Sequence, residues 1–263
     1  MIVEAFTWPP AASEALPAAV ALIVQNKPQE GHIFCSGVPI TPELVLTAAH
    51  CIQQFRKYWP EDALVVKNNT EEARTIRVKR WYIHPHFQQT PTPHQLDIDV
   101  ALLVLDGSLQ SKKERMEDLP VSIHKQTQSL WMKGYSPIRL KTDSARAILS
   151  SRHSWNQLSF ERELVQEGKL QLRTQDSQSA PCAGDSGAPL WSFENNSREL
   201  KAVVVQGNCA GGKANAISIR SMSEWIQNTL NQLNEYRSAA QELWKIYPKR
   251  LFAADHNSPL GRE

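Results

Sequence analysis

The sequence predicts an all-β protein with a barrel architecture, followed by one α-helix near its C-terminal end. Two observations predict this fold class. Short apolar or alternating runs recur along most of the chain, separated by Pro- and Gly-containing turns, and many short strands with such turns are typical of β-barrels. Near the C-terminus the spacing of apolar residues changes to three and four, which indicates an amphipathic helix.

The first half of the chain contains six predicted strands. Thr75–Ile83 alternates polar and apolar residues, which suits a strand with one buried face, whereas Val100–Leu105 is continuously apolar, as in a strand buried on both faces. Residues 1–17 are rich in Ala and Pro and are predicted to form an extended surface segment. We expect a loop carrying His50 to follow the third strand. The six strands are Ala19–Val24, Ile33–Val38, Leu44–Thr47, Leu64–Val66, Thr75–Ile83 and Val100–Leu105.

The second half begins after a charged segment, Ser111 to Asp118, which is the predicted connection between two halves of the protein. It contains further short apolar runs that are interpreted as strands. The runs are Val121–Ile123, Ser129–Met132, Leu170–Arg173, Trp191–Phe193, Ala202–Val205 and Ile217–Ile219.

The predicted helix follows the last of these strands. Ser221 or Ser223 is expected to cap its N-terminus, and Pro248 is expected to end it. Its apolar face is formed by residues at three- and four-residue intervals: Trp225, Ile226, Thr229, Leu230, Leu233, Tyr236 and Ala240.

Composition and charge exclude several classes of protein. With 263 residues, the chain is long enough for one large domain or two small ones that share a core. The 29 basic and 27 acidic residues nearly balance, so nucleic acid is not an expected partner. The longest apolar runs, such as Ala18–Val24, fall well short of the ~20 residues that span a bilayer, so no membrane span is expected.

The four cysteines, Cys35, Cys51, Cys182 and Cys209, predict two disulfides. Their spacing fits no paired C-x-x-C zinc pattern, and we expect no metal and no cofactor. Disulfides indicate an oxidising compartment, yet residues 1–4 do not resemble a signal peptide. Secretion, with a leader already removed, is the favoured interpretation; a cytoplasmic protein with reduced thiols is the alternative.

Three short motifs carry the chemistry. Residues 184–190 read GDSGAPL and contain Ser186, residues 46–51 read LTAAHC and contain His50, and residues 97–103 read DIDVALL and contain Asp99. A serine hydroxyl is a poor nucleophile until a histidine takes its proton, and an acid holds that histidine in the correct tautomer. Asp97 competes with Asp99 because both project from the same face of a strand.

These motifs resemble those of the trypsin/chymotrypsin family of serine proteases, over about Ile2 to Leu233. The resemblance implies two six-stranded β-barrels with the active site in the cleft between them. It also implies the disulfides Cys35–Cys51 and Cys182–Cys209. The implied organisation is a peptidase domain over residues 1–235, with barrels at about 18–115 and 120–222 and a helix from about 222, followed by a C-terminal extension over 236–263.

The resemblance further implies a role for each site residue. Ser186 would attack the scissile carbonyl of a protein or peptide substrate, His50 would act as general base and then acid, and Asp99 would orient His50. The backbone N–H groups of Gly184 and Ser186 would form the oxyanion hole. The family's aspartate that corresponds to Asp185 pairs with a newly freed N-terminal amine.

That pairing bears on the start of the chain, which reads Ile2-Val3-Glu4 and resembles the family's new N-terminus, with Ala5 in place of the usual Gly. We therefore expect an activating protease to cleave before Ile2.

Substrate preference is implied by alignment with the family. Ala180 would form the base of the primary specificity pocket, and Gly207 and Ala216 its walls. Because no acidic residue stands at the base, a cationic side chain would be buried without a partner, which is costly. We expect medium to large apolar side chains before the scissile bond. The chain departs from the family at Val205-Gln206, where Ser-Trp is usual.

Two other functions remain open from sequence. One is a catalytically silent relative that keeps the fold and only binds. The other is an intracellular protease that a regulatory partner switches on.

Overall fold

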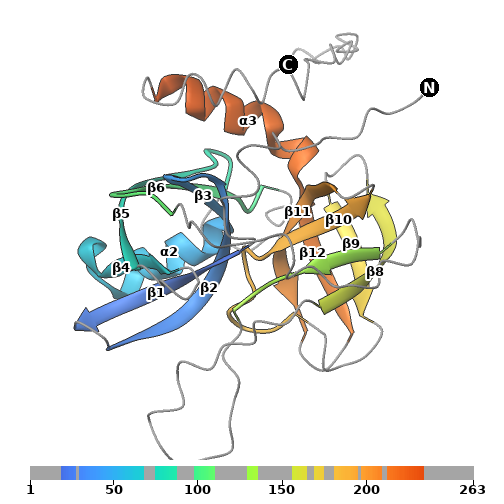
Figure 1. The fold of residues 1–263 in the computed structure, drawn as a ribbon, viewed down its shortest axis with the longest axis horizontal. Helices are drawn as coiled ribbons and strands as arrows, with labels where there is room; N and C mark the ends of the chain where they lie inside the picture. Colours follow the sequence, from blue (N-terminus) through green and yellow to red (C-terminus); the bar gives the residue numbers. More distant parts are fainter. Residues whose placement is uncertain are drawn as a thin grey trace, which may run out of the picture. The chain divides into compact units, whose positions relative to one another are not determined.

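The computed structural model describes residues 19–27, 30–67, 75–87, 98–109, 129–135, 156–164, 169–174, 181–194, 197–208 and 212–233. The chain divides into two compact units, Met1–Met222 and Ser223–Glu263. The first unit contains two closed six-stranded barrels, each entirely antiparallel (Figure 1). The predicted fold class is therefore confirmed.

The first barrel has the strand order β1-β2-β3-β6-β5-β4 and closes because β4 also pairs with β1. β3 and β6, which are buried along their whole length, are neighbours in it. This explains why both are continuously apolar in sequence, since both faces of each strand are covered. The strands are β1 Val20–Lys27, β2 Glu30–Thr41, β3 Leu44–Thr47, β4 Leu64–Lys67, β5 Thr75–Ile83 and β6 Ala101–Leu105.

The second barrel has the order β10-β11-β12-β9-β8-β7 and closes through the pairing of β7 with β10. Its interior is a cluster of buried apolar side chains that includes Met132, Leu190 and Val204. Such a core fills a small barrel completely. The strands are β7 Ser129–Met132, β8 Asn156–Leu164, β9 Lys169–Thr174, β10 Pro189–Glu194, β11 Ser197–Gly207 and β12 Lys213–Ser218.

Helix α2, Ala49–Tyr58, corrects one prediction, because His50 lies in its first turn rather than in a loop. The buried residues Ala49, Ile52 and Phe55 are three apart and form the inner face of this helix. The helix is short and no side chain caps its start, so the usual sequence signal for a helix N-terminus is missing. A single 3-10 turn, η1 Glu61–Ala63, precedes β4.

Helix α3, Ile219–Gln232, begins earlier than predicted. Ser221 and Ser223 therefore lie inside it, and the Ser221 hydroxyl donates to the carbonyl of Ser218 at 2.7 Å. The predicted apolar face is buried at Ile226, Leu230 and Leu233. The predicted positions Tyr236, Ala240 and Pro248 lie outside the described residues.

Most predicted strands are present, and within the described residues the structure differs from the prediction at two places. Strand β8 was not predicted, because its segment NQLSFEREL is dominated by polar and charged residues. The run Ile217–Ile219 is split, since β12 ends at Ser218 and Ile219 begins α3. Val121–Ile123 lies outside the described residues. A search of the described helices finds none with the length and apolar character needed to cross a membrane.

Candidate active site

The pairing of β3 with β6 brings His50 and Asp99 together. Thr47, the last residue of β3, lies opposite Ala101, the first residue of β6. His50 follows β3 by three residues and Asp99 precedes β6 by two, so both lie at the same edge of the first barrel. Antiparallel neighbours necessarily bring the end of one strand to the start of the next.

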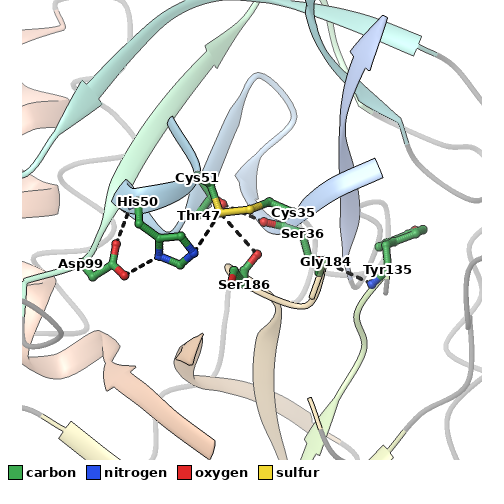
Figure 2. Close-up of a disulfide and its surroundings, with 9 residues drawn as sticks. All are labelled: Cys35, Ser36, Thr47, His50, Cys51, Asp99, Tyr135, Gly184 and Ser186. Carbon is green, nitrogen blue, oxygen red and sulfur yellow. Dashed lines mark hydrogen bonds and ion pairs between the residues drawn. A yellow bond between two sulfur atoms is a disulfide. The ribbon is translucent and has the colours of Figure 1, made fainter. Parts of the chain in front are cut away.

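The Asp99 carboxylate contacts His50 twice. Its Oδ2 lies 2.6 Å from the His50 Nδ1 atom, and its Oδ1 accepts the His50 backbone N–H at 2.8 Å (Figure 2). The Asp99 side chain is almost fully buried, at 2% exposed, while the His50 side chain is 26% exposed. A carboxylate only accepts hydrogen bonds, so the neutral imidazole that donates to Asp99 carries its proton on Nδ1 and has Nε2 as its acceptor.

Ser186 lies in the turn before β10 and approaches the same disulfide sulfur as His50. The Cys51 Sγ atom is 3.7 Å from His50 Nε2 and 3.9 Å from the Ser186 carbonyl oxygen (Figure 2). Within the described part of the chain, no hydrogen bond joins the Ser186 hydroxyl to the imidazole. In ligand-free sites, catalytic hydrogen bonds are often long and shorten when substrate binds.

Glycines shape the turn that presents Ser186. Gly184 and Gly187 have φ of 100° and 83°, in the left-handed region that favours glycine. A Cβ on Gly187 would collide with the carbonyl oxygen of Ser36 and with the hydroxyl of Thr47. Backbone from the two barrels therefore touches directly beneath the serine. The Gly187 N–H donates to the Val204 carbonyl at 2.7 Å, which joins the turn to β11.

Asp185 is buried, at 4% exposed, between the two residues proposed to bind the oxyanion. Its Oδ2 accepts the N–H of Cys182 at 2.9 Å, and its Oδ1 lies against Gly134, where any Cβ would collide with it. The carboxylate thus lies inside the protein beside the nucleophile turn. Ile2, its expected partner after cleavage, lies outside the described residues.

The predicted specificity pocket is only partly brought together. Gly207, at the end of β11, packs against the backbone of Pro181, where a Cβ would collide with the Pro181 carbonyl. Ala216, in β12, is fully buried among the core residues of the second barrel. Ala180 lies outside the described residues.

The disulfide Cys35–Cys51 links β2 to α2 beside His50. Cys182 is also disulfide-bonded, and its predicted partner Cys209 lies outside the described residues. In the described regions, the sulfurs of Cys35 and Cys51 cluster with His50 in the manner of metal ligands. Because both sulfurs are in the disulfide, they offer no thiolate to a metal.

Two residues near the nucleophile were missed by sequence reasoning. Ser36 and Tyr135 contact the turn or each other through hydrogen bonds. Ser36 belongs to the segment Phe34-Cys35-Ser36-Gly37, which attracts attention only through its cysteine. Sequence spacing contains no signal that would join Ser36 to a turn about 150 residues later.

Comparisons with known proteins agree with this fold. The family described as Trypsin matches residues 9–226. Tissue-type plasminogen activator from Bos taurus is 29% identical over 224 residues, 75% of this chain and 38% of the relative. The protein of the same name from Sus scrofa is 29% identical over 228 residues, which are 75% of this chain and 39% of that protein. Granzyme M from Homo sapiens is 27% identical over 173 residues, 62% of this chain and 65% of that protein.

The chain spans about two fifths of the length of the plasminogen activators that it matches. The family match, in contrast, covers most of the chain and includes all strands of both barrels. The chain therefore belongs to the trypsin family of chymotrypsin-like serine endopeptidases.

Proposed function

We propose that this chain hydrolyses peptide bonds by means of His50, Asp99 and Ser186. The observation that carries the proposal is the contact between His50 Nδ1 and Asp99 Oδ2 at 2.6 Å. It supports an imidazole whose other nitrogen, Nε2, is free to accept a proton. Ser186 lies on the glycine turn beside the same disulfide, and its hydroxyl would hydrogen-bond to that nitrogen when substrate is bound.

The proposed reaction has two halves. Ser186 Oγ attacks the scissile carbonyl carbon while its proton moves to His50 Nε2; the imidazolium then protonates the leaving amine, which leaves an acyl-enzyme. In the second half, water attacks the acyl carbon while His50 takes its proton, and the protonated His50 returns that proton to Ser186 Oγ as the carboxylic acid product leaves. Asp99 stabilises the imidazolium in both halves. The negative oxygen of each tetrahedral intermediate would be bound by the N–H groups of Gly184 and Ser186.

Substrate preference is proposed on the chemistry of the pocket residues. Ala180 offers no charge to Arg or Lys, so we propose apolar side chains before the scissile bond. Gly207 lies against Pro181, the residue next to Ala180, so any side chain at position 207 would collide with the Pro181 carbonyl. A peptide panel in which Arg or Lys is strongly preferred would contradict the proposal.

Activation is proposed to follow cleavage before Ile2. The buried Asp185 carboxylate offers the negative charge that a new α-amino group would meet. N-terminal sequencing of active material tests this step, since full activity with an uncleaved N-terminus would exclude it. The disulfides further support an oxidising, extracellular environment.

The decisive experiment is labelling with a fluorophosphonate, followed by cleavage of a peptide library. After cleavage before Ile2, the chain with Ser186 should be labelled at that residue, and Ser186→Ala, cleaved in the same way, should lose both labelling and peptide cleavage. Ser192→Ala is the matched control, because Ser192 is a buried serine whose hydroxyl has no hydrogen-bond partner among the described residues.

The alternatives predict different results. A silent binding protein would remain unlabelled even after cleavage before Ile2. A protease switched on by a partner would be labelled only when a cell component is added.

A further inference from the structure

Ser36 lies in β2, the second strand of the first barrel, yet it contacts the nucleophile turn of the second barrel. It is fully buried, at 0% exposed. Figure 2 shows its side chain between the turn that carries Gly184 and Ser186 and the segment that carries Tyr135. No role for Ser36 follows from the mechanism above.

Every polar group of Ser36 has a partner. Its hydroxyl donates to the Gly184 carbonyl at 2.7 Å and accepts the Tyr135 N–H at 2.9 Å. Its backbone N–H donates to the Ser186 carbonyl at 2.8 Å. Its carbonyl accepts the Thr47 hydroxyl at 2.7 Å. A buried hydroxyl that uses both its donor and an acceptor site has one orientation and no competing water.

We propose that Ser36 is a positioning residue for the oxyanion hole, an inference that rests on the proposed function. Its side chain holds the carbonyl of Gly184 and its backbone holds the carbonyl of Ser186. Gly184 and Ser186 flank Asp185 in the chain, and their N–H groups are the ones that would bind the oxyanion. A residue from one barrel thus fixes the orientation of donors in the other.

Gly184 needs such support because it lacks a side chain. Its φ of 100° is accessible to glycine together with many other conformations. Without the Ser36 hydroxyl, the peptide between Gly184 and Asp185 could rotate. Because glycine restricts φ and ψ little, the preceding peptide, which carries the N–H of Gly184, could then reorient as well. A donor that must be reoriented during the reaction stabilises the transition state less than one already in place.

The test is Ser36→Ala in the full-length, activated chain. We expect kcat to fall about 10- to 100-fold with KM within about twofold of its original value, because loss of a whole oxyanion donor costs ~10²–10³ and Ser36 acts through that donor. The affinity of a peptide boronic acid, which forms a tetrahedral adduct on the serine, should fall by the same factor. The affinity of a product peptide should not change.

Two further variants separate positioning from stability. Ser36→Gly also removes the hydroxyl but leaves the N–H that binds Ser186, so its kcat should match that of Ser36→Ala. Thr229→Val removes another buried hydroxyl, which donates to the Trp225 carbonyl at 2.8 Å in α3. It should lower the melting temperature and leave kcat and boronic-acid affinity unchanged. A merely structural Ser36 would behave like Thr229.

The possible results are distinguishable. If the chain without substitutions, cleaved before Ile2, neither hydrolyses peptides nor reacts with fluorophosphonate, the proposed function is overturned, and this inference with it. An active chain whose Ser36 variants retain kcat overturns the positioning role alone. If both variants fail to fold, a crystal structure of the unmodified chain with a peptide aldehyde decides: Ser36 Oγ within hydrogen-bonding distance of the Gly184 carbonyl supports the role, and displacement from it overturns the role.

Discussion

The two halves of the candidate site are built differently. His50 and Asp99 both come from the first barrel, where the pairing of β3 with β6 places them and two hydrogen bonds join them. Ser186 comes from a turn of the second barrel that depends on two positive-φ glycines and on contacts with Ser36. The base-acid pair is therefore assembled by local sheet geometry, whereas the nucleophile is positioned by contacts between the two barrels.

The largest expected effect is on the nucleophile half. Ser186→Ala should reduce kcat by about 10⁶-fold, and adding His50→Ala should reduce it little further, because the two residues act as one unit. Single-turnover and steady-state kinetics on one peptide substrate measure both effects. Independent, multiplying losses would show that the two side chains do not cooperate.

The base-acid half is broken most specifically by Asp99→Asn. An amide can donate to Nδ1 and so stabilise the wrong imidazole tautomer, and we expect kcat to fall about 10⁴-fold with little change in fold. Steady-state kinetics and a melting curve check this. Asp106→Asn, at an exposed aspartate just after β6, is the matched control and should have full activity. Equal losses in both variants would exclude a specific role for Asp99.

The contact between barrels is tested by Gly187→Ala. The new Cβ would meet the Ser36 carbonyl and the Thr47 hydroxyl at a φ of 83°, so we expect a loss of roughly 2–4 kcal/mol in the free energy of unfolding. Denaturant unfolding measures it. Gly107→Ala should cost less, since it also places a Cβ at a positive φ, 159°, but that Cβ would meet one side-chain atom of Ile76 at 3.4 Å and no backbone. Similar losses at both positions would mean that the barrels do not touch at Gly187.

The smallest expected effect concerns pH and a histidine outside the site. Burial, followed by the charge of His86, lowers the pKa of His84 below 6.5. As the pH falls below 6.5, His84 takes up a proton in the unfolded chain before it does so in the folded chain. The free energy of unfolding therefore decreases until the pH passes the folded-state pKa of His84. Denaturant unfolding at pH 7.5 and pH 5.5 should show a smaller loss for His84→Asn than for the unmodified chain. An identical loss would contradict this assignment.

Much of the fold and of the site could be predicted because the relevant signals are local. The continuous apolar run of β6 and the alternation in β5 reflect which faces of each strand are covered, so the burial of these strands can be predicted from adjacent residues. Helix α2 was missed because its start has no capping side chain and it spans only Ala49–Tyr58. The burial of Ala216 in the core of the second barrel could not be read from the alignment, which does not say which face of β12 is inside the barrel.

The amino-acid sequence alone is enough to identify the residue types that the chemistry requires and most of the strands, because burial imposes a local period of apolar residues. The contacts of Ser36 with Gly184 and of Gly207 with Pro181 are known only from the folded structure. These contacts join segments far apart in the chain, and their existence depends on how closed barrels fit against each other, which no local pattern of residues encodes.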